Sequence, residues 1–83
     1  MIHEYIQAAL ELAHYEMIED EEPYYGEIDT LQGVWATGRT LEECRRNLAE
    51  TIEGWILVRF QNNLDIPEIK GFSVNPVSEL KVA

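Results

Sequence analysis

The fold of this chain is decided where a strand gives way to a helix, at Gly38-Arg39-Thr40-Leu41-Glu42-Glu43. Thr40 and Glu43 have the spacing of a capping box, in which the threonine hydroxyl accepts from the backbone N–H three residues later and the glutamate reaches back. Glu42 and Glu43 also lie where the positive end of a helix dipole favours anions. We therefore expect a long helix to begin directly after Thr40.

Downstream of the cap, apolar side chains recur at the spacing of one helical face, at Leu41, Cys44, Leu48, Ile52 and Trp55. The helix is expected to end near residue 62 or 63, ahead of the helix-stopping Pro67. Its second half is apolar all round and must be covered on more than one side. Two coverings remain open: a homo-oligomer packed through Trp55, Ile56 and Phe60, or the N-terminal helix together with the C-terminal tail.

Three short runs of β-forming residues precede the cap, at residues 14–18, 24–28 and 34–37. Four consecutive carboxylates and Pro23 separate the first two runs and favour a turn there. Runs this short, joined by polar connections, indicate an antiparallel meander. Tyr24 and Tyr25 must then point to opposite faces, so one packs inward and the other faces solvent or a partner.

The N-terminal residues have the apolar spacing of an amphipathic helix, which we place within residues 1–13. After the long helix, Phe72-Ser73-Val74 is a candidate fourth strand. The expected fold class is α+β, in the order α-β-β-β-α-β. It forms a single domain over residues 1–83, with an N-terminal helix at 1–13, a core at 14–69 and a short tail at 70–83.

Charge narrows the range of partners. Sixteen acidic and six basic residues give a net charge of −10, which repels phosphate and favours a basic partner. The order helix, three strands, helix also occurs in double-stranded RNA-binding domains, but those use basic side chains. Here Glu42 and Glu43 open the second helix, so we expect no direct nucleic acid binding.

Length and cysteine content set further limits. A domain of 83 residues buries only about 60% of its unfolded surface, so its core is marginal and a homo-oligomer is favoured. One cysteine, Cys44, allows no intrachain disulfide. The N-terminus lacks a signal-like basic region, and the longest apolar run, residues 55–58, is too short to cross a membrane. We expect a cytoplasmic protein that is not attached to a membrane.

Residues that could support catalysis have no suitable arrangement in the sequence. His3 and His14 lack the partner spacing of a metal site or a catalytic triad, and Cys44 lies on an apolar helix face, where an inert thiol is expected. The acidic run 19–22 lacks the ligand spacing of a calcium loop. We therefore expect no enzyme activity and no catalytic, cofactor-binding or metal-binding residues.

A set of short motifs carries a family resemblance, namely Tyr25-Gly26, Leu31-x-Gly33, Gly38-x-Thr40-Leu41-Glu42-Glu43, Asn47 and Trp55. In order and spacing the chain resembles the HicB-like antitoxin family over roughly residues 14–69. The resemblance implies a partial ribonuclease-H-like fold without the nuclease's carboxylates. It also implies cytoplasmic oligomers that bind and neutralise a small basic HicA-type toxin, an mRNA-cleaving ribonuclease.

The chain departs from that family in three places, the first of which is an extra N-terminal helix ahead of the first strand. Residues 29–34 lack the two prolines and the cysteine that are frequent there, and the short tail is not expected to form the C-terminal DNA-binding segment of many members. The expectation is a short antitoxin-like member that contacts its toxin through Tyr24, Tyr25, Glu27 and Asp29. An orphan interaction or self-assembly module is the alternative. A magnesium-dependent hydrolase is a third reading, but the carboxylates have no recognisable placement for it.

Overall fold

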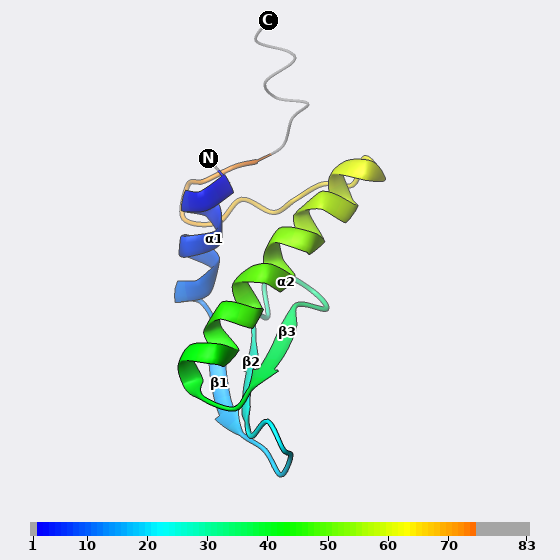
Figure 1. The fold of residues 1–83 in the computed structure, drawn as a ribbon. Coiled ribbons are helices and arrows are strands. Elements are labelled where there is room, and N and C mark those ends of the chain that lie inside the picture. The colour runs from blue at the N-terminus through cyan, green and yellow to red at the C-terminus, as the bar shows by residue number, and fades with distance from the viewer. Residues whose placement is uncertain (1, 75–83) are drawn as a thin grey trace, which may run out of the picture.

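The computed structural model describes residues 2–74 of the chain. The elements follow in the order α1 (Ile2–Glu11), β1 (His14–Met17), β2 (Tyr24–Glu27), β3 (Trp35–Gly38) and α2 (Leu41–Gln61). The strands form an antiparallel sheet in the order β1-β2-β3. Helix α2 lies across this sheet, and α1 packs against α2 (Figure 1). The expected α+β order of helix, three strands and long helix is confirmed.

Strand register explains how closely α2 approaches the sheet. Gly26 pairs with Ala36, and Gly38 pairs with Tyr24, so these small residues share one face. A Cβ built on Gly38 would lie 2.4 Å from the backbone nitrogen of Cys44. Glycine at this position is therefore what allows the first turns of α2 to lie directly against β3.

The hydrophobic core lies between α2, the inner face of the sheet, α1 and the segment that follows α2. Its largest fully buried side chains are Tyr5, Ile28, Leu31, Cys44, Leu48, Ile52 and Ile56. Ile66, Ile69 and Val74 are also buried, because residues 64–74 run back from the end of α2 towards α1 (Figure 1). The Tyr5 hydroxyl fixes this return segment by donating to the Pro67 carbonyl oxygen at 2.6 Å.

The candidate fourth strand at residues 72–74 is wrong. Phe72 makes an isolated bridge with Ile69, closed by Lys70 and Gly71 at φ values of 50° and 84°. A turn this tight folds the segment back on itself above α1 instead of extending it beside the sheet. The remainder of the expected tail, residues 75–83, lies outside the described residues.

The second half of α2 is covered on one side by the chain itself. Ile56 is buried with residues of α1 and the 64–74 segment in the same core cluster. Of the two coverings considered for this side chain, the structure therefore shows packing within the chain's own core. Trp55 and Phe60 pack partly against that cluster. Leu57 and Val58, in contrast, remain 52% and 54% exposed.

Within residues 2–74, no helix is long and apolar enough to span a membrane.

Candidate protein-docking face

The face of the sheet that points away from α2 forms a patch of aromatic and acidic side chains. Alternation along the strands and the pairings His14↔Glu27, Glu16↔Tyr25, Tyr25↔Thr37 and Glu27↔Trp35 assign its members. We call it the outer face; it consists of His14, Glu16, Tyr25, Glu27, Trp35 and Thr37. None of the six is buried, so this face is open to solvent along all three strands.

An aromatic pair lies at the centre of the outer face. The rings of Tyr25 and Trp35 are stacked, with centroids 6.1 Å apart and an angle of 25° between their planes. Trp35 is nevertheless 55% exposed, although its neighbour Ala36 is buried on the other face. A large, rigid apolar side chain held in place but left accessible is typical of an interface anchor.

Carboxylates surround this aromatic pair. Glu16 and Glu27 come from the strands themselves, and Glu22 is held at the edge because its Oε1 accepts from the Thr37 hydroxyl at 2.6 Å. Partial burial raises the pKa of Tyr25, and the charges of Glu27, Glu16 and Asp29 raise it further. The contribution of these three carboxylates indicates that the aromatic pair lies in a locally negative field.

The charge of the whole β region has one sign. Residues 14–38 contain Glu16, Glu19, Asp20, Glu21, Glu22, Glu27 and Asp29, and no lysine or arginine. These seven carboxylates are a large part of the sixteen acidic residues in the chain. The outer face therefore has no lysine or arginine of its own that could neutralise it.

A shallow depression of about 220 Å³ adjoins the aromatic pair where β2 leads into β3. Tyr25, Glu27, Asp29 and Trp35 line its rim, while the core residue Leu31 lies beneath. The turn is closed by backbone bonds, among them Leu31 N–H to the Ile28 oxygen at 3.1 Å. The structure thus brings Tyr25, Glu27 and Asp29 together, as their positions in the sequence predict.

Two residues fall differently from the sequence-based expectation. Tyr24 pairs with Gly38 and shares the α2 side of the sheet, so it does not belong to the outer face. Trp35, to which the strand pattern assigns no role beyond β-formation, supplies the exposed member of the aromatic pair. Its alternation with the small Ala36 was the available signal, since the smaller residue faces the closely packed helix.

Trp55 and Phe60 belong to α2, and their side chains pack partly against the chain's own core. The Trp55 indole N–H donates to the Gln32 carbonyl at 3.2 Å, and the Arg59 guanidinium lies 4.7 Å from the Trp55 ring centroid. Arg59 Nε also donates to the Asp65 carbonyl at 2.7 Å. These contacts fix the end of α2 to the segments around it.

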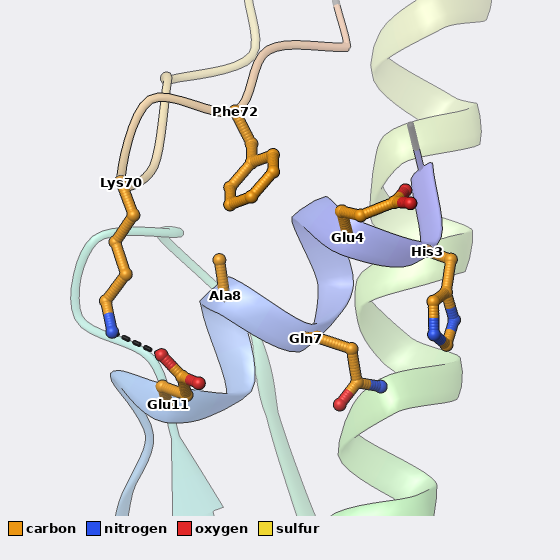
Figure 2. A pocket seen from close by; sticks show the side chains of 7 residues that line it. All are labelled: His3, Glu4, Gln7, Ala8, Glu11, Lys70 and Phe72. Atoms are coloured by element: carbon orange, nitrogen blue, oxygen red, sulfur yellow. Dashed lines mark hydrogen bonds and ion pairs between the residues drawn. The ribbon is translucent and has the colours of Figure 1, made fainter.

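A second hollow, of about 330 Å³, lies between α1 and the 64–74 segment (Figure 2). Lys70 pairs with Glu11 on one side of it, and Phe72 lies over Ala8. The hydrogen bond from Lys70 and its charge lower the pKa of Glu11. This hollow is built from contacts that dock the return segment on α1, and it shares no residue with the outer face.

The surroundings of the histidine, cysteine and carboxylate side chains determine whether they could bind a metal ion or react as a nucleophile. In residues 2–74, no three side chains of the His, Cys, Asp or Glu types come together in a way that could hold a metal ion. Cys44 is fully buried, its Sγ lies 3.5 Å from the Ala36 oxygen, and burial followed by the charge of Glu22 raises its pKa. A raised pKa disfavours the reactive thiolate form.

Together these features define a class: a small α+β protein in which a long helix covers one face of a three-stranded sheet and leaves the other, acidic face open. The chain belongs to the UPF0150-like family, whose model matches residues 4–67. It is also similar to the crystal structure of TTHA0281 from Thermus thermophilus. That similarity has a TM-score of 0.81 and 42% sequence identity, and it covers 88% of this chain and 90% of that one. No curated protein matches the chain.

Proposed function

We propose that this chain is a HicB-like antitoxin that neutralises a small basic HicA-type ribonuclease by docking its outer face over the toxin's RNA-binding site. The observation that carries the proposal is the stacked Tyr25–Trp35 pair, exposed on an open sheet face and flanked by carboxylates. The motif resemblance over residues 14–69 supports the same function.

Charge supports a basic protein as the partner. A ribonuclease must attract RNA phosphates, so its substrate site is positive, and the outer face offers Glu16, Glu22 and Glu27 to that site. Such complementarity accelerates encounter and excludes acidic competitors. RNA itself is repelled by the same field. Because this chain would cover the RNA-binding site of the toxin, the toxin could not bind this chain and RNA at the same time.

The aromatic pair supports a tight complex. Carboxylates at a rim contribute mainly to association rate, whereas affinity comes from anchors that lose water at the centre of an interface. Trp35 is such an anchor, because Tyr25 already holds its ring and little side-chain freedom remains to be lost on binding.

The test is inhibition of RNA cleavage by the purified HicA-type protein of the same organism, with affinity measured by calorimetry. The unmodified chain should block cleavage at equimolar concentration. Trp35→Ala should weaken binding at least about 30-fold, as for a central anchor. Met17→Ala removes an apolar side chain that is 63% exposed and shares the other side of the sheet, and it should bind as the unmodified chain does.

A charge-reversal pair separates local from overall charge. Glu27→Lys and Glu68→Lys change the net charge equally, but Glu68 is an exposed residue of the return segment. Glu27→Lys should weaken binding about tenfold or more at low salt and flatten the salt dependence, while Glu68→Lys should do much less. Equal losses in the two variants would contradict docking on the outer face, and uninhibited cleavage would contradict the antitoxin function.

A further inference from the structure

The sheet has one edge at which backbone groups lack a partner within residues 2–74. Strand β1 is the outermost strand on that side, and all of its residues are at least partly exposed. Helix α2 packs mainly against β3 and β2 (Figure 1). We propose that the β1 edge binds an extended, basic segment of a different polypeptide, which adds to the sheet as a further strand. The inference concerns the edge of the sheet and does not depend on the proposed function.

Hydrogen-bond alternation shows which backbone groups of β1 point outward. In an antiparallel pair, residues that bond to the neighbouring strand alternate with residues whose N–H and C=O point away from it. The Ile18 N–H donates to the Pro23 carbonyl at 2.8 Å, and Glu16 lies two residues earlier in the same register. Glu16 therefore bonds to β2, whereas the backbone groups of Tyr15 and Met17 point outward. No backbone bond from these outward groups is formed within residues 2–74.

The opposite edge of the sheet, at β3, is partly closed by α2. The Ile28 N–H donates to the Val34 oxygen at 3.2 Å, so Thr37, three residues after Val34, turns its backbone groups outward. The Thr37 carbonyl accepts from Asn47 Nδ2 of α2 at 2.9 Å. Extended peptides add to sheets at edges whose backbone groups remain free. Strand β1 is therefore the edge that can accept one.

Charge and alternation determine what kind of strand fits. Glu16 is exposed on β1, and four carboxylates follow at residues 19–22, with no lysine or arginine in β1, in β2 or in the turn between them. Opposite charges on neighbouring strands stabilise a pair, so side chains of the added strand on the outer-face side should be basic. On the other side Met17 is 63% exposed, and apolar side chains fit beside it. The segment that fits alternates basic and apolar residues.

A second copy of this chain fits the edge poorly. If two β1 strands paired antiparallel about a two-fold axis through their outward groups at Tyr15 and Met17, Glu16 of one copy would lie directly opposite Glu16 of the other. Like charges directly opposite destabilise a strand pair. Each copy would also bring its acidic run 19–22 and a net charge of −10. The edge therefore favours a basic segment of a different polypeptide.

The first experiment measures amide hydrogen exchange by NMR in the full chain, with and without a synthetic peptide of about eight residues that alternates lysine and valine. Saturating peptide should slow exchange at the Tyr15 and Met17 amides at least about tenfold, because their N–H groups gain acceptors. The Glu16 amide is already bonded to β2 and should change little, so it is the internal control. Unchanged exchange at Tyr15 and Met17 would overturn the inference.

A matched pair of variants tests the backbone contribution. Met17→Pro removes the outward N–H without breaking a bond to β2, whereas Met17→Ala keeps this N–H and removes only the exposed side chain. Calorimetry with the same peptide should show at least a tenfold loss of affinity, about 1.4 kcal/mol, for the proline variant. The alanine variant should bind nearly as the unmodified chain does, and circular dichroism should confirm that both are folded. Equal affinities for the two variants would contradict strand addition.

Two altered peptides test the occupant without changing the protein. A peptide with N-methylated backbone amides keeps its charges but cannot donate main-chain hydrogen bonds, so it should not bind measurably. A peptide with glutamate in place of lysine should also fail, because it meets the carboxylates of the edge. Equal binding of the N-methylated peptide would show attraction by charge alone. Equal binding of the glutamate peptide would show that the edge does not select basic segments, and either result would overturn the inference.

Discussion

Single glycines determine how the layers of this molecule fit together. At Gly38 an added Cβ would lie 2.4 Å from the Cys44 nitrogen and 2.7 Å from its Cα, both backbone atoms at the start of α2. Backbone cannot rotate aside as a side chain can, so relief requires movement of the whole helix. Gly54, in the same helix as Cys44, has open space around it. The same substitution therefore has opposite consequences at these two positions.

We predict that Gly38→Ala lowers the free energy of unfolding by about 3 kcal/mol, as overpacking against a fixed neighbour does. Gly54→Ala should raise the free energy of unfolding by about 0.5–1 kcal/mol, since alanine favours the helix. Urea denaturation followed by circular dichroism measures both. A neutral Gly38→Ala variant would contradict the close contact between β3 and α2.

At the scale of elements, α2 is held at its N-terminus by a cap and by side-chain bonds to the sheet. Thr40 Oγ1 accepts from the Glu43 N–H at 3.0 Å, and Glu43 Oε1 accepts from the Arg39 N–H at 2.9 Å. The glutamate thus reaches one residue further back than the capping box predicts. Asn47 Nδ2 donates to the Thr37 oxygen at 2.9 Å, which ties the second turn of the helix to β3.

Removal of the cap should destabilise the protein through this one helix end. Thr40→Ala should cost about 1 kcal/mol of unfolding free energy, because it leaves the Glu43 N–H without its acceptor. Thr51→Ala is the matched control: its hydroxyl donates to the Asn47 carbonyl oxygen within the helix at 2.9 Å, an interaction of little net value. Chemical denaturation should show a loss for the first variant and no loss for the second; equal effects would refute the capping role.

At the scale of the whole molecule, α1 and the 64–74 segment close the core over the second half of α2. Tyr5 joins the two through its bond to Pro67, sixty-two residues away in sequence, and Lys70 pairs with Glu11 beside it. Burial raises the pKa of Tyr5 to about 12 from an ordinary value of 10.0, and the Arg59 charge opposes the rise. The folded state therefore holds the Tyr5 proton more tightly than the unfolded state does.

This linkage predicts a loss of stability in alkali. Between pH 10 and about 12 the unfolded chain releases the Tyr5 proton and the folded chain keeps it, so the free energy of unfolding falls as pH rises through this window. Two pKa units correspond to at most about 2.7 kcal/mol. Tyr5→Phe should show a shallower decline over the same window in pH-dependent urea denaturation. Parallel curves for the two proteins would contradict the assignment.

The sequence by itself determined the local elements. The cap at Thr40, the helical spacing in residues 2–13 and the β-forming runs before Gly38 predict α1, the three strands and α2 to within a few residues of their observed ends. These signals are local because they depend on backbone groups a few residues apart. The proximity of Tyr25, Glu27 and Asp29 could be predicted for the same reason, since they lie in one strand and the turn that follows it.

The tertiary structure decided which faces are covered. Alternation puts Tyr24 and Tyr25 on opposite faces, but the packing of α2 against Gly38 is what turns Tyr25 and Trp35 outward. Helical spacing likewise could not tell whether Ile56 meets a second copy or the chain's own return segment, which buries it. Burial depends on residues that are distant in sequence. A local pattern therefore predicts the direction in which a side chain points, but not which residues it contacts.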